Sequence, residues 1–187
     1  RFSAVLEELS YRNLSTNPSP GDRGVTVSLV SDTGGTSNGG SDTTIPAIET
    51  TVSIIDVNRA PSLSATATDP VYVEDGSPAA PFSNAAFDSG DGPQSVSALT
   101  FSVLNAVDGA DEIVTILGQD VSLSDGNSGT ISAAGLSFSV SVSGSEAVID
   151  LSGPLAPSDV ESLIDTLTYS NTAFNPDNIS REFVLRS

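Results

Sequence analysis

The sequence predicts an all-β sandwich with one short helix. Apolar and polar residues alternate over several short segments, and clusters of Gly, Asn, Asp and Ser separate these segments. A period of two is that of a strand with one buried face, and the clusters are typical of turns. Only one segment, near the C-terminal end, has helical periodicity instead. Many short alternating strands joined by turns are typical of a β-sandwich.

Five segments carry the strand pattern. They are 23–31, 50–57, 98–107, 136–143 and 146–152. The alternation places Leu99, Phe101 and Val103 on one face of the third segment, which predicts that this face is buried. In the fourth segment the expected inner face consists of Leu136, Phe138, Val140 and Val142. Turns are expected at 31–42, 88–95, 108–112 and 124–129.

The helix is expected at about 156–166. Ser158 is followed three residues later by Glu161, which is the pattern of a capping box. The apolar residues that follow have helical spacing, and they are Val160, Leu163, Ile164 and Leu167. This stripe predicts an amphipathic helix that packs over one end of the sandwich.

The composition excludes several classes of function. The chain has no Cys and no His, so the usual zinc, haem and iron–sulfur sites and the Ser–His and Cys–His catalytic pairs are not available. A net charge of −18 argues against nucleic acid and anionic membrane surfaces as partners, and no apolar run is long enough to insert into a membrane. Hydrolysis by two carboxylates is the one common mechanism left, and no motif selects a pair. We expect no enzyme and no catalytic residue.

A repeat sets the organisation of the chain. Residues 1–29 align with 159–187 without a gap, and the stretch LSYRNLSTNP returns as LTYSNTAFNP. The identical pairs are Leu9/Leu167, Tyr11/Tyr169, Asn13/Asn171, Asn17/Asn175, Pro18/Pro176 and Arg23/Arg181. The aligned residues also include the conservative pairs Val5/Leu163 and Leu6/Ile164. The alignment predicts that the chain is a segment of a longer tandem array of repeats.

The register of the repeat gives the domain boundaries. Residues 1–57 are expected to be the C-terminal part of one repeat, 58–61 a junction, and 62–187 most of the next repeat. The second repeat then has no counterpart of residues 30–57 and would lack its last strands. A sheet edge left open in this way tends to recruit a strand. Residues 45–57 are the closest substitute, by folding back or by insertion into a neighbouring molecule.

The junction Ile55-Asp-Val-Asn-Arg-Ala-Pro61 resembles the D-x-N-D-A-P motif that ends cadherin-like repeats of very large bacterial surface adhesins, which often also carry RTX repeats. DGADEIVTI (108–116) and SDVESLIDTLTYSN (158–171) are similar to those repeats as well, so the likeness covers nearly the whole chain. The resemblance implies an Ig-like or cadherin-like sandwich, an extracellular or cell-surface location, a role in cell adhesion, and neighbouring repeats as partners.

The resemblance also implies calcium at the junction. Asp56 and Asn58 match the motif, whereas Arg59 stands where the family has Asp, which removes one anionic ligand. The other candidate metal ligands are Glu74, Asp88, Asp91, Asp108, Asp111 and Glu112. The alternative is a linker without calcium that Pro61 stiffens, because Asp and Gly are also ordinary turn residues.

The leading hypothesis is a structural repeat module of an extracellular adhesin or filament that provides reach and cohesion and that calcium stiffens. One alternative is a calcium-dependent module that binds sugar or peptide. Another is a filament subunit that assembles head to tail by donating residues 45–57.

Overall fold

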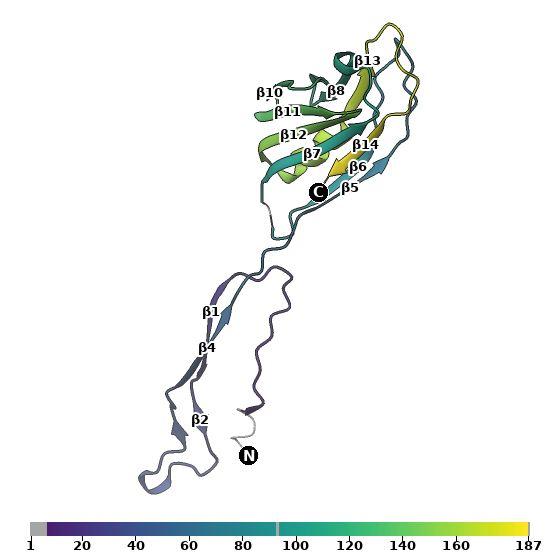
Figure 1. Cartoon of the computed structure of the whole chain (residues 1–187). Coiled ribbons are helices and arrows are strands. Elements are labelled where there is room, and N and C mark those ends of the chain that lie inside the picture. The colour runs from purple at the N-terminus through teal and green to yellow at the C-terminus, as the bar shows by residue number, and fades with distance from the viewer. Residues whose placement is uncertain (1–6, 93, 187) are drawn as a thin grey trace. The chain divides into compact units, whose positions relative to one another are not determined.

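The computed structural model describes residues 7–92 and 94–186 (Figure 1). The chain divides into two compact units, which we call unit 1, ending at Asn58, and unit 2, beginning at Arg59. The division falls within the predicted junction 58–61. Residues 1–6, which include the Val5 and Leu6 positions of the repeat alignment, lie outside the described residues.

Unit 1 is a long hairpin. Strand β1 (Gly21–Val27) pairs antiparallel with β4 (Ile48–Ile54), and β2 (Val30–Ser31) pairs with β3 (Thr43–Thr44). A 3-10 turn, η1 (Ser37–Gly39), lies between β2 and β3. None of the described residues of unit 1 is buried. The described part of unit 1 therefore has no core, and a two-stranded hairpin of this kind is marginally stable by itself.

Unit 2 contains the sandwich. One sheet has five antiparallel strands, in the order β10 (Ser128–Ile131), β11 (Leu136–Ser143), β12 (Glu146–Leu155), β7 (Val96–Leu104) and β14 (Glu182–Arg186). A three-stranded sheet has the order β13 (Thr168–Asn171), β8 (Glu112–Ile116) and β9 (Gln119–Ser122). Strands β5 (Ser62–Ala67) and β6 (Phe82–Asp88) form a further pair, and a 3-10 turn, η2 (Gly109–Asp111), precedes β8.

The core lies on the faces that the alternation predicts. Phe101 and Val103 of β7 are fully buried, opposite Ile149 and Ala147 of β12. In β11 the inner face is confirmed except that Val142 is only half-buried. The prediction of an all-β sandwich is thus confirmed, with the core in unit 2.

Four of the five predicted strand segments have other boundaries in the structure. The segment 98–107 is β7 (Val96–Leu104), and the segment 146–152 extends to Leu155 in β12. The segment 23–31 is divided between β1 and β2, and the strand expected at 50–57 ends at Ile54. The turn at 124–129 does not close a hairpin, because β9 and β10 belong to different sheets.

The predicted helix is α2 (Pro157–Asp165), and its apolar residues Val160, Leu163 and Ile164 are buried. The predicted capping box is wrong. Ala156 is the N-cap, no side chain caps the helix, and Ser158 already lies within the first turn. The reason is Pro157, whose fixed φ suits the first helical position and starts the helix one residue before Ser158.

Helix α2 lies against β6 and satisfies part of its backbone. The amide of Phe87 donates to Glu161 Oε1 at 3.0 Å, and the amide of Ala85 donates to Asp165 Oδ1 at 2.9 Å. Residues four apart on a helix and two apart on a strand have similar spacing, so the two carboxylates match two successive outward N–H groups. The helix thereby covers an edge of β6. No helix in the described part of the chain has the length and apolar character needed to cross a membrane.

Candidate functional site

A buried ionic cluster joins the approach to β14 to the start of β8. Arg181 Nη2 lies 2.7 Å from Asp108 Oδ2 and 2.9 Å from Glu112 Oε1, and its Nε donates to both Glu112 oxygens. The Glu112 side chain is 0 % exposed and that of Arg181 is 7 % exposed. The amides of Val107 and Asp108 also donate to Glu112, each at 2.9 Å. The buried carboxylate is therefore fully paired, as a buried charge requires.

Tyr169 and Asn171 of β13 complete this cluster. The Tyr169 hydroxyl donates to Glu112 Oε2 at 3.2 Å, and Asn171 Nδ2 donates to Asp108 Oδ2 at 2.7 Å. Burial, followed by the negative charge of Glu112, raises the pKa of Tyr169 to about 12. Burial acts to lower the pKa of Arg181, but its hydrogen bonds with Glu112 and the charge of that carboxylate outweigh burial and raise it.

The cluster fixes the loop between β13 and β14. Arg181 Nη1 donates to the carbonyls of Asp177 and Ile179, and the Asp177 amide donates to Asp108. No buried side-chain nitrogen or oxygen in the described residues lacks a hydrogen-bond partner. These contacts hold the loop between β13 and β14 against the start of β8.

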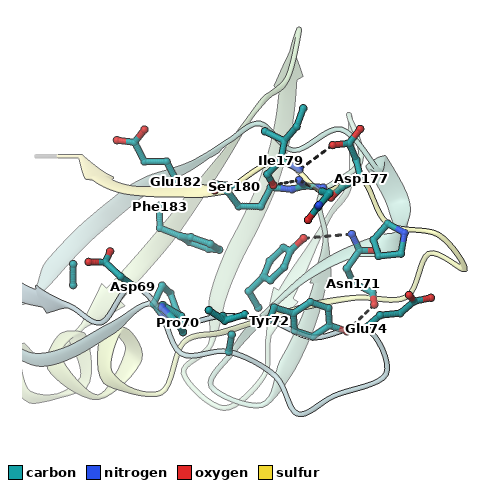
Figure 2. Close-up of a pocket in the computed structure, with 18 of the residues that line it drawn as sticks. Asp69, Pro70, Tyr72, Glu74, Asn171, Asp177, Ile179, Ser180, Glu182 and Phe183 are labelled. Atoms are coloured by element: carbon teal, nitrogen blue, oxygen red, sulfur yellow. Dashed lines mark hydrogen bonds between the residues drawn. The ribbon is translucent and has the colours of Figure 1, made fainter.

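A cleft of about 710 Å³ lies beside the cluster. Figure 2 shows its two walls: Ile179, Ser180, Glu182 and Phe183 on one side, and Asp69, Pro70, Tyr72 and Glu74 on the other. Tyr72 packs edge-on against Tyr169, with ring centroids 5.6 Å apart, and donates to the Asn171 carbonyl at 2.8 Å. The polar ends of the aromatic side chains in this cleft are therefore already engaged.

The loop that follows β6 wraps the start of unit 2. Asp91 Oδ2 accepts the Arg59 amide, and Asp88 Oδ1 accepts the Gly90 amide at 2.9 Å. Gly90 has φ +85°, and a Cβ at this position would lie 2.9 Å from the Arg59 Cβ and 3.1 Å from the Ala60 carbonyl oxygen. Glycine is needed here for both the backbone conformation and the close approach. The two Asp side chains serve this loop as acceptors for N–H groups.

The eight predicted metal ligands have different surroundings in the structure. Asp108 and Glu112 meet at Arg181, Asp88 and Asp91 share one loop, and Glu74 lies in the cleft wall. Asp56 and Asn58 belong to unit 1. The backbone carbonyl of Asp111 accepts a hydrogen bond from the Thr172 amide. Within residues 7–92 and 94–186, no three acidic, His or Cys side chains are grouped so that they could hold a metal ion.

In the interior cluster the donor set does not fit Ca²⁺. A guanidinium occupies the position between Asp108 and Glu112 that a cation would need, and it uses the same carboxylate oxygens. Sequence reasoning missed Arg181 as the centre of this cluster. The available signal was the identity Arg23/Arg181 at the repeat, because an arginine kept beside a strand in both copies indicates a specific contact.

The repeated segment has the same local hydrogen bonds in both copies. Arg23 donates to the carbonyls of Gly21 and Ser19, as Arg181 does to those of Ile179 and Asp177 at the equivalent positions. The Asn13 side chain accepts the amide two residues on, and so does that of Asn171.

The surroundings of the two copies differ. Leu167 and Tyr169 are 0 % and 7 % exposed, whereas their equivalents Leu9 and Tyr11 are 63 % and 45 % exposed. The segment therefore keeps several local hydrogen bonds in unit 1, but residues 10–13 are not a strand as β13 is, and no described residue around them is buried.

Comparison of the chain with protein-family models, curated proteins and solved structures found no match.

Proposed function

We propose that this chain is a structural repeat module of an extracellular bacterial adhesin or filament, located at the cell surface, whose partners are neighbouring repeats of the same protein. Its role is to provide reach and cohesion. The Ig-like or cadherin-like type of the sandwich is part of this proposal.

One observation carries the proposal: the repeated segment has the same local hydrogen bonds twice, with a core around only one copy. In a tandem array each segment of this kind packs within its own module. Unit 1 then corresponds to the end of a module whose other strands are not in this chain. The fully paired Arg181–Glu112 cluster agrees with a structural role, because it fixes a loop and leaves no reactive group.

A chain with the second module completed tests the proposal. Residue 187 aligns with residue 29, so a copy of residues 30–57 appended after Ser187 supplies the missing counterpart in register. We expect the melting temperature of unit 2 to rise by at least about 3 °C, because burying one Val or Ile stabilises by about 1.5–3 kcal/mol and each kcal/mol shifts a domain of this size by about 2–4 °C. The control appends the same residues in scrambled order. Equal melting temperatures for the two extended chains would contradict the proposal.

Calcium as a stiffener of the module is a second component, and it rests on the resemblance of the junction motif. If the candidate ligands bind Ca²⁺, saturating calcium raises the melting temperature and EDTA reverses the rise, because a ligand that binds only the folded state stabilises it by mass action. Magnesium at the same ionic strength is the control for screening of the −18 net charge. A melting temperature that EDTA does not change removes calcium from the proposal and leaves the structural role intact.

A calcium-dependent module that binds sugar or peptide is the second candidate function. The observation in its favour is the cleft of about 710 Å³, which is in the size range of small-ligand sites and has Tyr72 in one wall. A glycan array probed with and without Ca²⁺ decides this: binding that the change Tyr72→Ala abolishes supports the candidate, and an array without signal rejects it.

A further inference from the structure

The five-stranded sheet has an open edge at β14. Among the described strands, β14 pairs only with β7, and its residues Phe183, Val184 and Leu185 remain half-buried. The edge of β6 is treated differently, since α2 covers it and supplies acceptors to its amides. Proteins usually protect sheet edges in this way because an unprotected edge pairs readily with another strand.

The cleft meets this open edge at the start of β14. Glu182 and Phe183 of β14 line it, as do Ser180 and Arg181 just before the strand, although successive side chains of a strand point to opposite faces. A cleft lined by side chains from both faces of a strand lies at the edge of that strand and not over one face alone. The opposite wall includes Asp69, Pro70, Tyr72 and Glu74 (Figure 2), and Val71, which also lines the cleft, is 85 % exposed. The cleft of about 710 Å³ is the space that an added strand would enter.

The chain contains a strand whose partner is the repeat equivalent of β14. Strand β1 aligns with the residues that lead into and form β14, and β1 pairs with β4. The register pairs Val27 with Ile48, Val25 with Thr50 and Gly24 with Thr51. When the equivalent residues of β14 replace those of β1 in this register, Ile48 lies opposite Leu185, Thr50 opposite Phe183 and Thr51 opposite Glu182.

This register also matches the faces. Opposite residues of paired strands share a face, so Ile48, Val52 and Ile54 would lie on the same face as Phe183 and Leu185. Phe183 points into the core, where it packs edge-on against Phe82 and Tyr169. The apolar side of β4 would therefore extend the core at its open side.

In the described part of unit 1 these apolar residues are only partly covered, with Val52 and Ile54 half-buried. Ile48 is 52 % exposed, and the other exposed large apolar residues of unit 1 are Leu9, Tyr11, Leu14, Leu29, Ile45, Ile55 and Val57. Exchange of β1 for β14 would keep the antiparallel pairing over Glu182–Leu185, the part of β14 that this register covers, and would add burial. Main-chain hydrogen bonds over this stretch and the removal of apolar surface from water favour the exchange.

We propose that β4 of a second copy of this chain pairs with β14 in the register it has with β1, filling the cleft beside residues 69–74. This inference rests on the proposed function, because it uses the equivalence of repeats. The contact is heterologous, with a donor and an acceptor on each molecule, so it produces rings or filaments and not closed two-fold dimers. In a longer chain the next repeat would supply the same strand.

A cysteine pair tests the register, since the chain has no cysteine of its own. In the chain with Thr51→Cys and Glu182→Cys, both at exposed positions, the proposal places the two thiols directly opposite each other in neighbouring molecules. Mild oxidation is expected to give a ladder of disulfide-linked oligomers, and mass spectrometry of digested material is expected to show the 51–182 bond. Opposite residues in antiparallel strands have the Cα separation that a disulfide needs.

The matched control is Ser53→Cys with Glu182→Cys, which moves one thiol two residues along the same face of β4. The diagonal separation of about 7–8 Å disfavours the bond, so we expect roughly tenfold less cross-linked product. Three outcomes would overturn the proposal. The two cysteine pairs could give equal yields, the 51–182 bond could form within single molecules, or light scattering could find the chain monomeric at every concentration.

The completed chain, which carries a copy of residues 30–57 after Ser187, separates this inference from the proposed function. If both hold, the appended strand stabilises unit 2 and abolishes the intermolecular ladder by filling the edge in the same molecule. A stabilised completed chain together with a monomeric original chain overturns strand donation alone. If the appended residues do not stabilise unit 2, the proposed repeat module is overturned as well.

Discussion

Arg181 is the residue on which the loop before β14 depends most. Its five donor groups reach two carboxylates and two backbone carbonyls, and Glu112 has no access to solvent. A buried charge that loses its partner costs far more than a surface ion pair contributes. Arg23 has equivalent backbone contacts but forms no ion pair with the described residues, so the chain contains its own control.

Replacement of Arg181 by Met is expected to lower the free energy of unfolding by about 3–5 kcal/mol, because Glu112 is left buried without its counter-charge. The same change at Arg23 is expected to shift it by no more than about 0.5 kcal/mol, the usual size for a surface position. Urea unfolding followed by circular dichroism measures both. Similar losses at the two positions would show that the contacts with backbone carbonyls, and not the ion pairs, carry the effect.

Tyr169 makes the cluster sensitive to alkaline pH. Its pKa is about 12 in the folded chain against 10.0 for an ordinary tyrosine, so folding favours the protonated hydroxyl. A raised pKa contributes stability that is present below pH 10 and is lost as the pH rises toward 12. We expect the melting temperature to fall over this interval, and to fall less steeply after Tyr169→Phe. Tyr11→Phe, at the equivalent exposed position, should keep the slope of the original chain. Parallel slopes for all three chains would contradict this assignment.

At the scale of elements, two sheet edges of unit 2, those at β6 and β14, are treated in opposite ways. Helix α2 covers β6 with Glu161 and Asp165, whereas the described residues leave β14 uncovered. The helix therefore does more than pack its apolar stripe on the core. It also supplies acceptors to strand amides that would otherwise lack them.

Replacement of Glu161 by Ala tests this role. The Phe87 amide would lose its acceptor in a half-buried position, which costs about 1–3 kcal/mol. Glu161→Gln retains an acceptor oxygen and should recover most of the loss. Asp159→Ala is the control on the same helix, since Asp159 is exposed in the first turn and contributes only about 0.3–1 kcal/mol through the helix dipole. If the Ala and Gln variants at 161 lose equal stability, the hydrogen bond is not the cause.

At the scale of the whole molecule, the two units contain different shares of a module. Unit 2 has the buried core, and unit 1 has no buried residue among those described. We expect protease to cleave unit 1 first and to leave a resistant fragment that begins close to Arg59, because cleavage follows local opening and unit 1 has little to oppose it. Resistance of unit 1 in concentrated samples, lost on dilution, would instead indicate that other molecules cover it.

The sequence was sufficient for the fold class, the inner faces of 98–107 and 136–143, the helix, and the repeat. These features depend on periodicity and on similarity, which are local properties of the chain. Sequence alone did not reveal the Arg181 cluster, since Asp108, Glu112 and Tyr169 meet only after β8 and β13 pair. It also did not show that Pro157 starts the helix in place of Ser158, or that Glu161 bonds to β6.

The sequence by itself thus determined that one segment occurs twice and that strands dominate. Only the tertiary structure decided that LTYSNTAFNP is packed while LSYRNLSTNP is exposed, with Leu167 at 0 % and Leu9 at 63 % exposure. The physical reason is that burial depends on the strands that surround a segment, and the surrounding strands are present in unit 2 alone. The same absence of neighbours leaves β4 available as a partner for β14.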